Sequence, residues 1–511
     1  MLARPFALLA MAFLFVHPLA AASAKSKSLI KDAAAYIDSG SDKYTKGDID
    51  GAIADFNAAI VLNPKLAKAY YSRGLAHYDK GSLQEAIADY DQAIKLNPRF
   101  EDAYVNRALA KDDANDHDGA IADVNMALKL DPRDPYAYNN RGWAYYRKGN
   151  LTAAIADYNL AINLDPKMSQ PYNDRGVAER ESGKLTEAMA DYTRAIALNP
   201  KDEQAYYNRA IAREDQGDFA GAIDDDTAAL AIDPKYKEAY QHRAEVKLEQ
   251  ENWADALTDF NRVIELDAKN AAAYNERGLA YYHQADSHAA LADYNRALEL
   301  DPKNANALNN RGNLERFLGQ TDTALADFNR AIAFDPKHES AYNDRGLIKE
   351  SRGDFPGAIA DYRKALELDP KNAEALSNLA SVSCARGDWS DAVAYADRAI
   401  KIDDKFAQAF NNRGVAKYHA GDVAGALADY DRAIEIDPDD ERAYNNRGLA
   451  LHANGDTAAA VADFDMAIAI DPHFTAAQQN RQLVKWKSGD FFGALADMIG
   501  ADLAGLKNQN Q

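Results

Sequence analysis

Arginine and aspartate recur in this chain at a fixed spacing of 34 residues, and both residue types could do chemistry. Twelve arginines and thirteen aspartates occupy two fixed places of the period, 16 residues apart. A row of arginines could bind anions, because a guanidinium group matches carboxylate and phosphate oxygens. A partly buried arginine also needs a carboxylate partner, so the two residue types could instead pair with each other. Representative pairs are Arg73 with Asp89, Arg277 with Asp293, and Arg447 with Asp463.

One period of the chain decides between these two interpretations. It carries Leu379 in place of the arginine and Tyr395 in place of the aspartate, and no other period lacks the aspartate. A joint replacement indicates that the two side chains touch, which favours a structural ion pair over an anion site. Pairing with the preceding period would leave both Asp361 and Arg413 unmatched, whereas pairing within a period leaves only Asp55 unmatched. We therefore predict ion pairs within each period.

Asparagine is the third recurring residue type, at two adjacent places of the period. An amide donates and accepts hydrogen bonds at once, as an extended peptide backbone requires. This asparagine ladder could hold a peptide without reading its sequence, but it could also solvate a groove or bridge adjacent helices. Its members are Asn106, Asn139, Asn140, Asn173, Asn208, Asn275, Asn309, Asn310, Asn343, Asn378, Asn411, Asn412, Asn445, Asn446 and Asn480.

No other group of residues points to catalysis, a metal or a cofactor. The ten histidines lack the spacing of metal ligands. The acidic run at residues 112–118 faintly resembles a calcium loop, but its oxygens are out of phase and His117 interrupts it. Capping and solvation explain this run, and likewise Asp224 to Asp226. Phosphate loops and nucleophile elbows are also lacking, so we expect no enzyme activity, no metal and no cofactor.

The charge balance narrows the classes of partner. The chain has 59 basic and 80 acidic residues, a net charge of −21. Nucleic acids and anionic lipid surfaces attract clustered Lys and Arg, so this balance disfavours both as partners. Cys384 is the single cysteine and cannot form an internal disulfide. With no histidine or cationic cluster beside it in the sequence, we interpret it as an inert helical residue.

The first 24 residues differ in composition from the rest. One basic residue precedes an apolar run at residues 6–16, and small residues follow as far as Ala24. This order is typical of a secretory signal peptide. The apolar run is too short to span a membrane, and Pro18 follows it. We expect cleavage after Ala22 or Ala24, no stable membrane insertion, and a mature protein in the periplasm or secreted.

The elements that must position these side chains come from one 34-residue repeat. With Ala33 as repeat position 1, fourteen units cover residues 33–506, between a lead-in at 25–32 and a tail at 507–511. Positions 4, 7, 8 and 11 have helical spacing, and glycine at position 15 ends this helix A in eleven units. Helix B follows, with alanine at position 20 in every unit. It ends before the period's prolines, which are Pro64, Pro98, Pro132, Pro166, Pro200, Pro234, Pro302, Pro336, Pro370, Pro438 and Pro472.

The pattern closely resembles the tetratricopeptide repeat (TPR). The shared features are an aromatic residue at position 4, glycine at 8, alanine at 20 and 27, an aromatic residue at 24 and proline at 32. The chain departs from it at Glu251 and Ala268, which replace the glycine and proline of unit 7, and at Asp226, which replaces an aromatic residue. The resemblance implies an all-α, right-handed superhelical solenoid of helix-turn-helix units, with a concave groove lined by the A helices. Arginine at position 7 and aspartate at position 23 are unusual for the family.

Function follows from the surface that such a fold offers. If positions 4, 7, 8 and 11 face helix B, the ladder at positions 5 and 6 faces the groove. We therefore predict a scaffold for protein–protein interaction that binds extended peptide or protein segments along the asparagines. The alternative is a periplasmic scaffold for an extended polymer or an exopolysaccharide export machine. The sequence is also compatible with a homo-oligomer.

Overall fold

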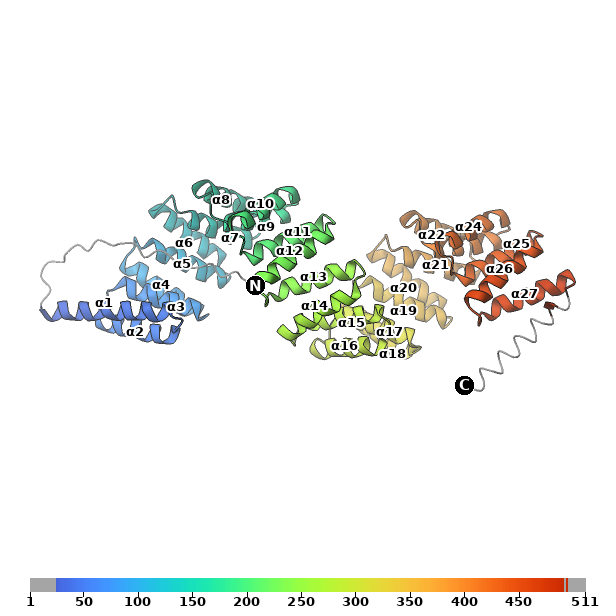
Figure 1. Cartoon of the computed structure of the whole chain (residues 1–511), viewed down its shortest axis with the longest axis horizontal. Coiled ribbons are helices and arrows are strands. Elements are labelled where there is room, and N and C mark those ends of the chain that lie inside the picture. The colour runs from blue at the N-terminus through green and yellow to red at the C-terminus, as the bar shows by residue number, and fades with distance from the viewer. Residues whose placement is uncertain (1–23, 491–492, 495–511) are drawn as a thin grey trace. The chain divides into compact units, whose positions relative to one another are not determined.

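The computed structural model describes residues 24–490 and 493–494, and in these residues every regular element is an α helix. Figure 1 shows the helices as successive antiparallel pairs, each pair joined by a short turn. The all-helical solenoid of repeated helix pairs predicted from the sequence is confirmed. Thirteen complete pairs and the A helix of unit 14 are described.

Except for α1, which starts well before Ala33, each A helix begins at or near the first residue of its repeat unit. The A helices are α1 (Ala24–Thr45), α3 (Ala67–Asp79), α5 (Glu101–Asp113), α7 (Pro135–Arg147), α9 (Gln170–Glu181), α11 (Glu203–Asp215), α13 (Lys237–Glu249), α15 (Ala271–His283), α17 (Ala305–Phe317), α19 (Glu339–Ser351), α21 (Ala373–Arg386), α23 (Ala407–His419), α25 (Glu441–Ala453) and α27 (Thr475–Ser488).

Each B helix has fourteen residues. These are α2 (Ile49–Leu62), α4 (Leu83–Leu96), α6 (His117–Leu130), α8 (Leu151–Leu164), α10 (Leu185–Leu198), α12 (Phe219–Ile232), α14 (Trp253–Leu266), α16 (Ser287–Leu300), α18 (Thr321–Phe334), α20 (Phe355–Leu368), α22 (Trp389–Ile402), α24 (Val423–Ile436) and α26 (Thr457–Ile470).

The turn between the two helices of a pair has one backbone conformation throughout. All fourteen residues at position 15 have a positive φ, including Asn115, Glu251 and Ala285, which replace the usual glycine. The next residue often caps helix B: the Asp48 side chain accepts a hydrogen bond from the N–H of Gly51 at 3.0 Å. The residue that ends helix A and the residue that caps helix B are therefore adjacent in the sequence.

Small and large side chains interlock inside each pair. Every described alanine at positions 20 and 27 is buried, as is Val263, the exception at position 27. The aromatic ring at position 24 lies against the glycine at position 8, where a Cβ on Gly142 would stand 2.7 Å from the ring of Tyr158. Where Val124 and Ala396 replace the ring, alanine replaces the glycine. This match fixes how closely helices A and B approach.

The chain divides into two compact units. One, residues 1–266, contains α1 to α14, and the other, residues 267–511, contains α15 to α27. Helix α1 starts at Ala24, so the residues expected as a lead-in at 25–32 are already helical. Residues 1–23 of the expected signal peptide and the expected tail at 507–511 lie outside the described residues. None of the described helices is both long enough and apolar enough to cross a membrane.

Candidate interaction surface of the A helices

The recurring arginine joins helices A and B of its own unit. Arg277 donates through Nε and Nη2 to the two carboxylate oxygens of Asp293, both at 2.7 Å. Arg73 makes the same two-pronged contact with Asp89, and Arg447 with Asp463. The aspartates are buried and the arginines half-buried. The side chains that the sequence predicted to pair within a unit are therefore in hydrogen-bond contact.

The arginine also contacts the preceding unit, which the sequence analysis missed. Arg107 donates through Nη1 to Asp91 at position 25 of the unit before, at 2.5 Å. Position 25 offers Asn, Asp or Thr oxygens to the arginines in ten further units. These contacts join Arg73 to Asn57, Arg141 to Asn125, Arg175 to Asn159, Arg209 to Thr193, Arg243 to Thr227, Arg311 to Asn295, Arg345 to Asn329, Arg413 to Asp397, Arg447 to Asp431, and Arg481 to Asp465.

This contact explains a third replacement, in unit 10, next to the unusual unit 11 (residues 373–406). Position 25 of unit 10 is Arg363, which is compatible with Leu379 in unit 11 because a leucine needs no acceptor. Elsewhere the hydrogen bonds to Asp89 raise the pKa of the Arg73 guanidinium above its ordinary value. With its nitrogens bonded in two directions, each arginine acts as a clamp between units rather than as a site for a dissolved anion.

The asparagines form bridges between consecutive A helices. The side-chain N–H of position 6 donates to the side-chain oxygen of position 5 in the preceding unit, 35 residues earlier. The position-5 asparagines are buried, whereas most of those at position 6 are half-buried. Bridges at 2.9–3.1 Å join Asn208 to Asn173, Asn310 to Asn275, Asn378 to Asn343, Asn446 to Asn411, and Asn480 to Asn445.

For the remaining asparagines at position 6, the hydrogen bond depends on which residue stands at position 5 of the preceding unit. Asn106 donates to the Tyr71 hydroxyl at 3.1 Å, and Asn412 donates to the Ser377 hydroxyl at 3.1 Å. Asn140 donates no such bridge within the described chain, because Val105 stands at the opposing place and offers no side-chain oxygen.

The bridge reverses where aspartate replaces asparagine at position 6. Asn139 donates to Asp174 at 3.0 Å, and Asn309 donates to Asp344 at 3.1 Å. A carboxylate can only accept, so the amide oxygens of Asn139 and Asn309 are buried without a hydrogen-bond partner. Burial raises the pKa of the Asp174 carboxyl to about 7.

A second row of bridges connects the far ends of the A helices. Position 12 of one unit contacts position 13 of the next, again 35 residues later. Tyr44 donates to Asp79 at 2.5 Å and Tyr78 donates to Asp113 at 2.6 Å. Tyr146 donates to Glu181 in the same way. The two rows lie two helical turns apart, so they fix the register of neighbouring A helices.

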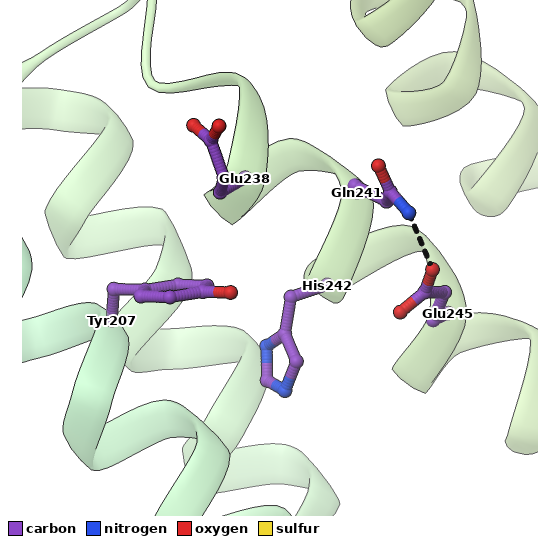
Figure 2. Close-up of a pocket in the computed structure, with 5 residues that line it drawn as sticks. All are labelled: Tyr207, Glu238, Gln241, His242 and Glu245. Carbon is purple, nitrogen blue, oxygen red and sulfur yellow. Dashed lines mark hydrogen bonds between the residues drawn. The ribbon is translucent and has the colours of Figure 1, made fainter. Parts of the chain in front are cut away.

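The ladder is interrupted between units 6 and 7, where a small pocket opens. Tyr207 and His242 stand at the two ladder places, and their rings meet edge to face with centroids 5.7 Å apart. Figure 2 shows both rings beside Glu238 and the hydrogen-bonded side chains of Gln241 and Glu245. These five residues line a cavity of about 170 Å³.

His242 lies between two carboxylates. Its Nδ1 is 2.7 Å from Asp226 and its Nε2 is 3.0 Å from Glu214. Burial lowers the pKa of His242, but the two carboxylates outweigh it and the net pKa is raised. Asp226 is fully buried, which raises its pKa to about 6. Solvation of the run Asp224 to Asp226 was therefore the wrong interpretation for Asp226, because a neighbouring unit supplies a buried partner.

The acidic run at residues 112–118 also has structural contacts. Asp112 lies 2.6 Å from the ring of His117, and Asp116 caps helix α6 through the N–H of Gly119. Within the described residues, no three His, Cys, Asp or Glu side chains are grouped as metal ligands. Burial raises the pKa of the Cys384 thiol to about 11, as befits an unreactive residue.

Comparison with known families supports the repeat assignment. Models described as TPR repeat or tetratricopeptide repeat match residues 40–81, 67–100, 105–169, 176–217, 243–305, 293–326, 350–383, 372–402, 416–455 and 441–474. Together they cover well over half of the chain. No curated protein matches it.

Several solved structures are similar to this chain, and Cut9–Hcn1 shares its fold. The APC/C hetero-tetramer Cut9–Hcn1 matches with a TM-score of 0.54 and 13% identity, covering 90% of this chain and 98% of that one. Yeast Tom70 matches with a TM-score of 0.39 and 20% identity, over 88% of this chain and 99% of that one. The MamA protein is 26% identical, with a TM-score of 0.31, over 34% of this chain and 93% of that one.

Proposed function

This chain belongs to the tetratricopeptide repeat family, whose repeats support a protein–protein interaction scaffold, and we propose that it binds extended peptide or protein segments along its A helices. We propose further that the chain is not an enzyme, because buried carboxylates with raised pKa values, such as Asp174 and Asp226, are engaged in bridges between helices. Its partners are proteins or peptides rather than nucleic acid, since the net charge is −21.

The observation that carries the proposal is the half-buried row at position 6. In Asn208, Asn310 and Asn480 the side-chain N–H is used by the bridge, and the oxygen accepts no hydrogen bond within the described chain. These three residues belong to units 6, 9 and 14, and asparagine occupies position 6 in four consecutive units, 11 to 14. A partner in extended conformation could donate backbone N–H groups to them. The sequence suggested that whole amides, donor and acceptor together, would face a partner. In this proposal the bridges use the N–H groups, so that only the acceptor oxygens are held in place for a partner.

At Tyr207 and His242 the row of asparagines is interrupted, and the pocket there would bind a different part of the partner. Its lining includes Glu238 and Glu245, so it favours a hydrogen-bond donor or a cationic side chain of the partner. The aromatic face of Tyr207 adds to the attraction for a cation.

Backbone hydrogen exchange of the mature chain with a captured partner tests the proposal. We propose export to the periplasm, so a periplasmic extract is the source for affinity capture. The expected result is slowed exchange in the A helices of several consecutive units, with the B helices unchanged. Protection confined to B helices would contradict the proposed surface.

A further inference from the structure

Unit 11 (residues 373–406) is the one described unit in which the cation at position 26 has lost the side-chain partners that this cation has in other units. In units 7, 8, 10 and 12 this cation pairs with a glutamate three residues later, at 2.6–2.8 Å. These pairs are Arg262–Glu265, Arg296–Glu299, Lys364–Glu367 and Arg432–Glu435. In unit 11 the cation is Arg398, and the glutamate is replaced by Lys401. An attractive pair has become two like charges.

Two other side-chain partners of a position-26 arginine are missing from unit 11 as well. Arg194 and Arg296 lie over the position-4 rings of Tyr172 and Tyr274, at 5.9 and 6.0 Å from the ring centroids. Arg330 contacts the position-23 aspartate, Asp327, at 3.4 Å.

Unit 11 has Leu376 at position 4 and Tyr395 at position 23, and both pack into an apolar cluster around Ala399. The replacement that removes the interhelical ion pair therefore also removes the counter-charge for Arg398.

Three cationic side chains without partners in the described chain line one cleft. Pro370 and Lys371, in the turn after α20, and Arg398, Lys401 and Ile402, on α22, line a cleft of about 490 Å³. Across the described residues, none of the three cationic side chains has an ion-pair or hydrogen-bond partner. Ile402 is 42% exposed and adds an apolar wall.

Two neighbouring carboxylates do not fill the cleft. Asp369 accepts a hydrogen bond from the backbone N–H of Lys371, and Asp403 accepts one from the backbone N–H of Lys405, both at 2.9 Å. Each is engaged in its own turn, as the equivalent aspartates of other units are.

We propose that this cleft binds an acidic peptide segment that carries an apolar side chain. Three cations around one exposed isoleucine complement a segment in which carboxylates flank an apolar residue. A long polyanion is less favoured, because the rest of the chain is strongly acidic and repels extended negative charge. The cleft residues belong to the B-helix side of the repeat, so this proposal does not depend on the A-helix surface.

Binding of a fluorescent Glu-rich peptide with one leucine, measured by anisotropy on the mature chain, tests the site. Lys401→Glu restores the Arg–Glu pair of the sister units, so the variant should fold normally and weaken binding about tenfold or more. The matched control is Lys95→Glu, at the same repeat position of unit 2, where Gln92 replaces the arginine. It changes the net charge equally and should leave the affinity unchanged.

Three outcomes would overturn the proposal. The first is that the parent chain does not bind the peptide at low salt. The second is that Lys95→Glu weakens binding as much as Lys401→Glu, which would mean that only net charge matters. The third is that an oligonucleotide of equal charge binds more tightly than the peptide and is equally sensitive to Lys401→Glu. Circular dichroism of each variant shows that loss of binding is not loss of fold.

Discussion

Asn446 donates its side-chain N–H to the Oδ1 atom of Asn411 at 3.0 Å, across the contact between helices α25 and α23. The two residues are 35 positions apart, one repeat plus one residue. The same relation recurs along the stack and turns two adjacent sequence positions into partners from different units. Stability of such an array depends on these contacts between neighbours as much as on each helix pair.

Replacing Asn310, Asn412 and Asn446 together by alanine should therefore destabilise the fold. Each change leaves a buried acceptor unsatisfied, at Asn275, Ser377 or Asn411, and costs on the order of 1 kcal/mol or more. Urea denaturation measures the loss. The matched control is Asn140→Ala, because Asn140 makes no bridge. Equal stability of the triple variant and the parent would show that the bridges do not hold the units together.

Arg277→Leu should lower the free energy of unfolding by about 3 kcal/mol, because it strands the buried carboxylate of Asp293. Arg277→Leu combined with Asp293→Tyr copies Leu379 and Tyr395, which pack in apolar clusters of unit 11. The double variant should recover much of the loss. Chemical denaturation of both variants decides the matter, and equal destabilisation would contradict the coupling of the two positions.

The sequence was sufficient for the helix pairs and the ion pairs because the signal for each lies inside one repeat. Glycine at position 15 predicts the turn, and the joint change at Leu379 and Tyr395 predicts a contact. Contacts between units were harder to predict from the sequence. Periodicity identifies which face of a helix is buried, but it does not say how far one helix is shifted along the next. The acceptor at position 25 varies among Asn, Asp and Thr, so it looks like ordinary polar surface.

The pocket between units 6 and 7 could not be predicted for a related reason. Asp226 in place of a ring looks like a defect of unit 6 alone. Its partner His242 belongs to unit 7 and occupies a place where most other units have asparagine or aspartate. The available signal was the joint occurrence of Asp226 and His242, which are 16 residues apart and lie on either side of the boundary between units 6 and 7.

Ala285→Gly should stabilise the chain by about 1 kcal/mol, because Ala285 has φ +60° and an L side chain is strained there. The reverse change, Gly319→Ala, should destabilise by about as much, since φ is +76° and no atom lies within 4 Å of an added Cβ. The two variants thus isolate backbone strain from packing. Thermal melting of both is the measurement, and shifts of the same sign would contradict this explanation.

Asp174→Asn should stabilise the protein in a manner that depends on pH. Burial raises the pKa of Asp174 from 3.8 to about 7, so the folded state binds this proton more tightly than the unfolded chain. The stability that the proton on Asp174 contributes to the folded state is fully present below about pH 3.8 and is lost as the pH rises through about 7. At pH 8 the parent must keep an ionised carboxylate buried, a penalty of up to about 4 kcal/mol for a pKa change of this size.

The asparagine variant escapes this penalty and regains a hydrogen bond. Its new N–H can donate to the Asn139 oxygen, which is buried without a partner in the parent. Urea denaturation at pH 5 and pH 8 should show the variant more stable than the parent at pH 8, with a smaller difference at pH 5. Asp224→Asn, at an exposed position of α12, should show little change at either pH. A stability difference between Asp174→Asn and the parent that is the same at both pH values would mean that Asp174 does not titrate with folding, and that only the regained hydrogen bond separates the two proteins.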